Sequence, residues 1–187
     1  MIPSRDEIQK SIFGAWRLLH YDRAAPYFFN LSIDGLRRSF MAPLAMLPLA
    51  LLSVVLARVN AEVPTFSLIG ETLGYVAFFV LWPLILIPVA RAAGLTRSYV
   101  PYVIAYNWSI VIIMVFMLPA SVAQAAQAER GGAGDIIYLV LALGSMAYQF
   151  MVARLAFQAS AALATGLVVL DFALTLLIGR VVNTLFY

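Results

Sequence analysis

The sequence predicts an all-α fold, a polytopic membrane helical bundle in which an N-terminal amphipathic interfacial helix precedes five transmembrane helices. Of its 187 residues 64% are hydrophobic and 11% charged, whereas soluble domains average about 45–50% apolar and 25% charged residues. The apolar residues form five long stretches. Four contain no charged residue, and the fifth, Leu155 to Tyr187, contains only Asp171 and Arg180. Stretches of about 18 or more apolar residues are typical of transmembrane helices.

The chain divides into an N-terminal cytoplasmic segment, 1–39, and one transmembrane domain, 40–187. Short connectors with charged residues separate the apolar stretches of the domain. The predicted spans are 40–57, 70–90, 99–121, 136–156 and 163–186. Five spans leave no room in these 187 residues for a separate water-soluble domain.

The first part of the N-terminal segment is predicted to be an amphipathic helix. Ser4, followed three residues later by Glu7, fits a capping box. Apolar residues then recur at helical spacing, while most charged residues fall elsewhere on the helix. Trp16 lies among these apolar residues, and we expect it to anchor the helix at the membrane interface.

A second short helix is predicted from Leu31 to Phe40, with Ser32 as its N-cap. Arg37 and Arg38 stand where the chain enters the first span, and we interpret both as interfacial anchors. Two interpretations of the whole segment stay open. It is either a platform that orients the first span or a docking surface for a cytoplasmic partner.

The distribution of Lys and Arg predicts the orientation, because these residues are enriched on the cytoplasmic side of membrane proteins. With the N-terminus inside, nine of the twelve basic residues fall on the inner side. These nine are Arg5, Lys10, Arg17, Arg23, Arg37, Arg38, Arg91, Arg97 and Arg154. An odd number of spans then places the C-terminus on the opposite side. The net charge of +3 is interpreted as a surface for anionic lipid headgroups, not for nucleic acid.

The sequence lacks the parts of known catalytic and metal centres. It has no cysteine and a single histidine, His20, so neither a histidine-based triad nor a zinc site can be assembled. Phosphate-binding loops, nucleophile elbows and HExxH motifs are also missing. We therefore predict no enzyme, no catalytic residue, no metal and no cofactor. Membrane lipids and other membrane-protein subunits are the expected partners.

Asp171 is the main candidate for a functional residue, because an ionisable group inside a span is costly and needs a partner. Asp171 in the fifth span and Asn107 in the third both lie about ten residues from the inner end, and Gln149 in the fourth lies at a similar depth. We therefore predict an intramembrane polar cluster of Asp171, Asn107 and Gln149, reached by the long side chain of Arg154. Further hydrogen-bonding candidates are Tyr106, Tyr148 and Thr175.

Three roles for this cluster stay open. Polar side chains that face each other inside a bundle hold helices together, so the cluster can be purely structural. Alternatively, it lines a path for transport or ion coupling, or it forms a site for a polar ligand or lipid headgroup. Two pairs of small residues, Gly70 with Gly74 and Ala162 with Gly166, are also predicted to allow close helix approach.

The layout resembles the Yip-type family of five-span integral membrane proteins, which includes bacterial relatives. The resemblance rests on the polar N-terminal segment, the five closely spaced spans and the stretch from Asn30 to Phe40, which is loosely similar to the family's Asp-Leu-x-Gly-Pro pattern. Leu36 follows Gly35 where proline is expected. The resemblance implies a membrane scaffold or trafficking-type protein without catalytic residues, and we expect the bacterial inner membrane as its location.

Two functional classes therefore remain. The first is a non-enzymatic bundle that serves as a scaffold, as an accessory or assembly subunit, or in binding lipids or partners. The second is a small transporter or channel-like protein with a polar path around Asp171. The two classes differ in whether Asp171 faces a cavity or a dry helix contact.

Overall fold

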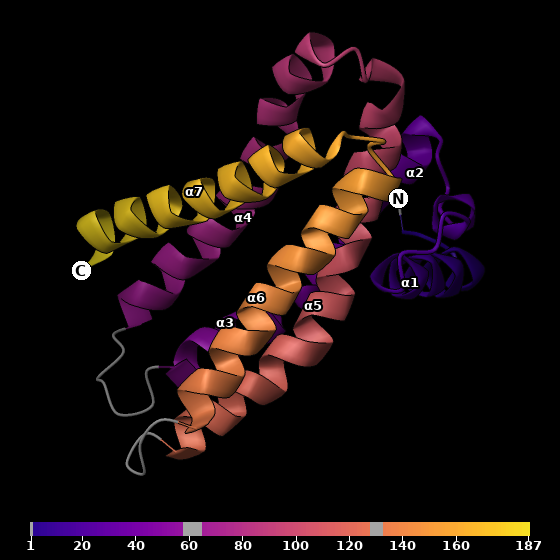
Figure 1. Ribbon diagram of the computed structural model, residues 1–187. Helices are drawn as coiled ribbons and strands as arrows, with labels where there is room; N and C mark the ends of the chain where they lie inside the picture. The colour runs from indigo at the N-terminus through magenta and orange to yellow at the C-terminus, as the bar shows by residue number, and fades with distance from the viewer. Residues whose placement is uncertain (1, 58–64, 128–132) are drawn as a thin grey trace.

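The computed structural model describes residues 2–57, 65–127 and 133–187, and every regular element among them is helical (Figure 1). In chain order the elements are α1 (Arg5–Leu19), η1 (Ala25–Phe28), α2 (Ile33–Ser39), α3 (Met41–Ala57), α4 (Thr65–Ala92), η2 (Thr96–Ser98), α5 (Tyr99–Gln127), α6 (Ala133–Leu155) and α7 (Ala161–Phe186). The η elements are short 3₁₀ turns. The predicted all-α fold is confirmed.

Five helical segments are long and apolar enough to cross a membrane, as an integral membrane protein requires. They run over Ile33–Leu56, Ser67–Ala92, Thr96–Ala123, Gly134–Leu155 and Ala161–Phe186. Each overlaps one of the predicted spans. The largest difference is in the first, where α2 extends the apolar segment back from residue 40 to Ile33.

The N-terminal helix α1 begins where its sequence predicts. The Ser4 side chain accepts a hydrogen bond from the backbone N–H of Glu7 at 3.1 Å, which caps the first turn. Ala15 and Leu18 are fully buried on the face that packs against α5 and α6. The hydroxyl of Tyr148 in α6 donates to the carbonyl of Ala15 at 2.8 Å. These contacts fasten α1 to the bundle.

We call the end of the bundle where α1, η1 and α2 lie beside the start of α5 and the end of α6 the capped end (Figure 1). Its core is rich in aromatic rings. Tyr102 of α5 stacks on Phe157 with 4.8 Å between ring centroids, and Trp82 of α4 lies 5.4 Å from the ring of Tyr106. All four are buried, and α5 is the most buried of the five spans. α5 is therefore the central helix of the bundle.

Away from the capped end, the long helices separate into two groups (Figure 1). α4 and α7 pack along each other, while α3 and α6 pack against α5. A Cβ at Gly70 would lie 2.8 Å from an α7 side chain, and one at Gly74 would lie 2.9 Å from Val182, so the close approach predicted for this pair is confirmed. The same prediction for Ala162 with Gly166 is wrong at the glycine, where a Cβ would meet nothing within 4 Å.

Candidate functional site: a polar cavity between two helix groups

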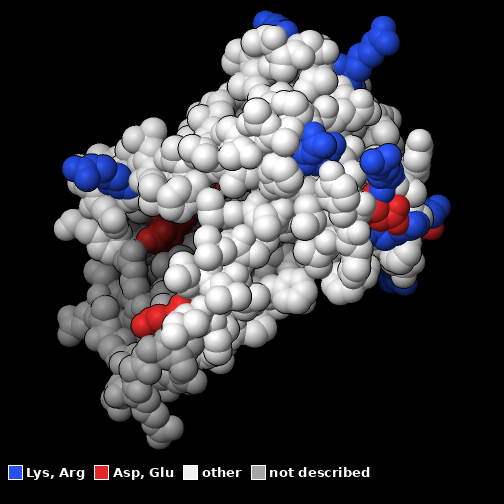
Figure 2. Space-filling model, in the orientation of Figure 1, with Lys and Arg blue, Asp and Glu red and all other residues white. Residues whose placement is uncertain are grey.

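A cavity of about 400 Å³ lies between the two helix groups and is lined by all five long helices, α3 to α7. This volume falls in the range of about 300–1,000 Å³ that is typical of small-molecule sites. Figure 2 shows the surface hollowed on this face, with acidic side chains inside the hollow. The polar residues of the lining are Glu71, Tyr75, Tyr106, Ser145, Gln149, Asp171 and Thr175. We call this space the open cavity.

Asp171 faces the open cavity from α7. Its carboxylate accepts a hydrogen bond from the hydroxyl of Tyr106 in α5, one of the partners that the sequence suggests. Tyr106 is only 4% exposed, since its ring packs against Trp82 and Tyr102. The hydroxyl that meets Asp171 is therefore held in place by the capped-end core. Within the described residues Asp171 forms no ion pair, and no Lys or Arg lines the cavity.

Gln149 lines the same cavity from α6. Its side-chain nitrogen donates to the hydroxyl oxygen of Ser109 at 3.4 Å, and that hydroxyl donates to the carbonyl of Tyr106 at 2.7 Å. The side-chain oxygen of Gln149 is buried and has no hydrogen-bond partner within the described part of the chain. Because a buried polar atom without a partner costs free energy, this oxygen marks a place where a donor would be favourable.

Asn107 lies outside the open cavity. Its side-chain nitrogen donates to the hydroxyl oxygen of Ser39 at 2.9 Å, and the Ser39 hydroxyl donates to the carbonyl of Leu36 at 2.7 Å. Asn107 and Ser39 are both buried, so this pair ties α5 to α2. The position of Asn107 along α5 agrees with the predicted depth. Depth alone does not determine the direction around the helix, where each residue turns about 100° from the last.

Arg154 also lies away from Asp171. Its guanidinium donates to the carbonyl of Ala159 at 2.6 Å and so closes the connection between α6 and α7. Arg154 is in the last turn of α6, where a cation is favourable beside the negative end of the helix dipole. Of the four predicted cluster residues, the structure therefore brings only Asp171 and Gln149 into one cavity.

Glu71 is a second carboxylate of the open cavity, and the sequence interpretation missed it. The predicted span 70–90 begins one residue before Glu71, whereas α4 begins at Thr65, so Glu71 lies in the second turn of the helix and lines the cavity. The hydroxyl of Tyr187, at the end of the chain, donates to Glu71 at 3.4 Å. The signal that could have found it is the spacing of four between Glu71 and Tyr75, which places both on one face of a helix.

Four aromatic rings line the open cavity beside the carboxylates. They are Tyr75, Phe78 and Phe79 of α4 and Tyr106 of α5. Their centroids lie 4.9 Å apart for Tyr75 and Phe79, and 6.5 Å apart for Phe78 and Tyr106. We call these four rings the aromatic wall.

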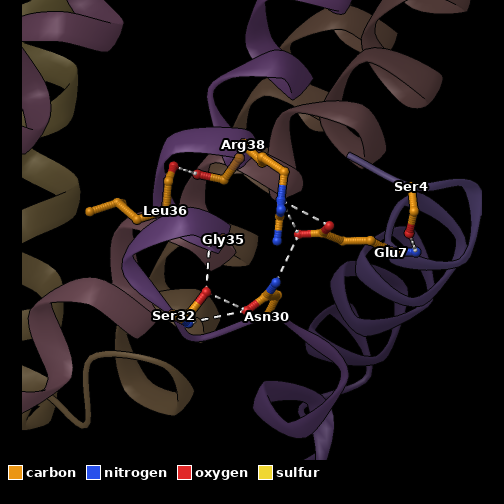
Figure 3. A network of polar contacts seen from close by, with 8 residues as sticks. Ser4, Glu7, Asn30, Ser32, Gly35, Leu36 and Arg38 are labelled. Atoms are coloured by element: carbon orange, nitrogen blue, oxygen red, sulfur yellow. Dashed lines mark hydrogen bonds and ion pairs between the residues drawn. The ribbon is translucent and has the colours of Figure 1, made fainter. Parts of the chain in front are cut away.

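The predicted interfacial anchors differ in exposure. Trp16 is 44% exposed, and Arg37 is exposed and forms a loose ion pair with Asp34 at 3.5 Å. Arg38 instead pairs with Glu7 of α1 at 3.0 Å (Figure 3). Because both side chains of this pair are largely buried, Arg38 connects α1 to α2 and does not project to solvent.

The same network fixes the entry to the first span. Asn30 donates to Glu7 at 3.2 Å and accepts from the hydroxyl of Ser32 at 2.7 Å. Ser32 caps α2 by accepting from the N–H of Gly35 at 3.0 Å, as the sequence predicts (Figure 3). A Cβ at Gly35 would lie 1.9 Å from the carbonyl oxygen of Asn30. Only glycine therefore fits at this position.

No protein-family model, curated protein or solved structure matches this chain. Over the described ranges, no three or more His, Cys, Asp or Glu side chains are grouped so that they could hold a metal ion. The cavity is therefore the feature of the molecule that bears on its function.

Proposed function

We propose that this chain is a non-enzymatic integral membrane protein whose open cavity binds an amphiphilic ligand, so that it acts as a lipid- or partner-binding bundle. The observation that carries the proposal is the cavity of about 400 Å³ between the helix groups, lined by Asp171 and Gln149 together with apolar side chains from five helices. A mixed lining of this kind suits a molecule with one polar end and one apolar end.

Two glycines of α7 offer a matched test. A Cβ at Gly179 or at Gly166 would meet nothing within 4 Å, yet Gly179 lines the open cavity and Gly166 does not. Gly179→Leu should fill part of the cavity without a clash, and Gly166→Leu should add the same side chain elsewhere on the helix.

The experiment is purification of the full chain directly into nanodiscs at native expression level, followed by mass spectrometry of lipids and proteins. We expect one amphiphile enriched near equimolar amounts in the wild type and in Gly166→Leu, and lost from Gly179→Leu. An identical lipid profile in all three proteins would contradict the proposal. A stoichiometric protein partner without an enriched lipid would favour an accessory or assembly subunit instead.

The second candidate function is a small transporter or channel-like protein. It is favoured by Asp171 facing a cavity and not a dry helix contact, and by a second carboxylate, Glu71, in the same cavity. In that case Asp171→Asn should fold normally and abolish transport in reconstituted vesicles.

We also propose that the capped end faces the cytoplasm of a bacterial inner membrane and that the C-terminus lies on the opposite side. The support is electrostatic, since nine basic residues lie on α1, α2 and the adjoining helix ends and turns, whereas Arg180 lies near the far end of α7. Arg58 and Arg130, which we predict on the outer side, lie outside the described residues. Membership of the Yip-type family remains part of the same proposal.

A further inference from the structure

We infer that the ligand of the open cavity is a monocationic amphiphile, with an ammonium head beside Asp171 and the aromatic wall and an alkyl chain along α3 and α7. The inference rests on the proposed function, because it names the chemical class of the ligand for the same cavity. Three independent features of the lining support it.

The first feature is the sign of the charge. Asp171 lines the cavity, and no Lys or Arg does so in the part of the chain that the structure describes. Among the described residues, Asp171 has the hydroxyl of Tyr106 as its partner but no cation. A carboxylate without a counter-ion in an apolar setting favours a positively charged ligand.

The second feature is that the lining offers acceptors and few donors. The hydroxyl of Tyr106 donates to Asp171, and the hydroxyls of Tyr75, Ser145 and Thr175 donate to backbone carbonyls at 2.9, 2.7 and 3.0 Å. The protons of these four lining hydroxyl groups are thus already used in hydrogen bonds. The buried oxygen of Gln149 accepts nothing. An anion would find few hydrogen-bond donors here. An ammonium group is itself a donor and not an acceptor, so it suits this lining.

The third feature is the aromatic wall. The faces of aromatic rings attract cations through their quadrupoles. Of the four rings, Tyr75 and Phe78 are half-buried and available to a ligand, whereas Phe79 and Tyr106 are buried and contribute less. The remaining wall is aliphatic, with Leu51 and Val54 from α3 and Val168, Ile178 and Val182 from α7. This part of the cavity suits an alkyl chain. A zwitterionic phospholipid fits less well, because its phosphate would meet no basic side chain among the described lining residues.

The test measures binding of four decyl amphiphiles to the full chain in nanodiscs by isothermal titration, with empty nanodiscs as the blank. The probes are decylammonium, decylphosphocholine, decyl sulfate and decyl maltoside, each below its critical micelle concentration. We expect the cation to bind tightest, by about tenfold or more over the zwitterion. Asp171→Asn should remove this preference while the neutral maltoside still binds, and Asp34→Asn, an exposed carboxylate at the capped end, should leave it unchanged.

The outcomes separate the two proposals. Equal binding of the cation and the zwitterion, or a cation preference that persists in Asp171→Asn, would overturn the inference but leave an amphiphile site in place. If no probe binds above the blank, or if Gly179→Leu binds every probe as the wild type does, the proposed function itself fails. Tyr106→Phe keeps the ring and loses the hydroxyl, and we expect it to retain the preference for the cation with a change of only a few-fold.

Discussion

At the capped end the buried amide of Asn107 has a partner 2.9 Å away, whereas in the open cavity the buried oxygen of Gln149 has none. The two regions also differ in packing. Around Gly35 a single added methyl group would collide with backbone, while around Gly179 it would meet nothing within 4 Å. At the capped end the Asn107 amide is paired and the space around Gly35 is filled, which serves stability, although the buried Ser11 Oγ and Trp82 Nε1 there also have no hydrogen-bond partner among the described residues. A region that keeps an orphan acceptor and empty space within the same bundle is arranged for a ligand.

Of the substitutions that test this contrast, Gly35→Ala at the capped end should lower the stability most. Its Cβ would lie 1.9 Å from the carbonyl oxygen of Asn30, which is backbone and must move if the methyl group is to fit. The shift would disturb the cap of α2 and the ion pair of Arg38 with Glu7. We expect a loss of about 3 kcal/mol in the free energy of unfolding, measured as a lower melting temperature in mild detergent.

The control for this prediction is Gly144→Ala in α6, where a Cβ would meet nothing within 4 Å. Since alanine is the better helix former, we expect no loss and a gain of up to about 0.5 kcal/mol. Equal melting temperatures for the two variants would show that the capped end tolerates an added methyl group and is less tightly packed than its geometry indicates.

The helical spans could be predicted because their signal is local. Long charge-free stretches and their charged flanks define where each helix can begin and end, and no knowledge of neighbours is needed. The capping residues Ser4 and Ser32 were found for the same reason, since a cap depends on residues within one turn.

The candidate site was predictable only in part, because it depends on rotation as well as depth. Asp171 and Gln149 reach the open cavity, but Asn107, one residue beyond Tyr106, faces α2. A burial preference around the helix would separate these two faces, but α5 is apolar on nearly all sides, so its sequence carries no such signal. Glu71 stands at the edge of an apolar stretch, where a charge normally marks the end of a span and gives no sign that it faces a cavity.

A paired substitution of the two amides should give an intermediate effect and sharpen the comparison. Asn107→Leu removes a buried interhelical hydrogen bond, and we expect a loss of about 1.5 kcal/mol, near the upper end of measured values in membranes. Gln149→Met removes an acceptor that has no partner together with the long, 3.4 Å hydrogen bond to Ser109, so we expect a smaller loss, within about 0.5 kcal/mol. Thermal unfolding in the same detergent compares the variants directly. A larger loss for Gln149→Met than for Asn107→Leu would mean that Gln149 is a structural contact and not part of a ligand site.

The smallest expected effect is a pH dependence confined to the capped end. Asp22 lies in the turn after α1, outside the spans, and accepts a hydrogen bond from the backbone N–H of Ala24 at 2.8 Å. This N–H, together with the ion pair to Arg17, holds the pKa of Asp22 below its ordinary value of 3.8. A carboxyl group with a lowered pKa in the folded state stabilises that state above its unfolded pKa. The stabilisation is lost as the pH falls through the lower, folded value.

The measurement is the melting temperature of the wild type and of Asp22→Asn from about pH 6 down to pH 3, over which the unfolded carboxylate takes up its proton. We expect the wild type to be slightly more stable above about pH 5 and the difference to shrink below pH 4, because Asn cannot titrate. High salt should weaken the effect, since Asp22 and Arg17 are both partly exposed. A difference in melting temperature between the wild type and Asp22→Asn that grows on acidification would contradict a lowered pKa for Asp22.

The same variant tests whether the two regions act independently. If the effect is confined to the capped end, Asp22→Asn should leave amphiphile binding in the open cavity unchanged at neutral pH.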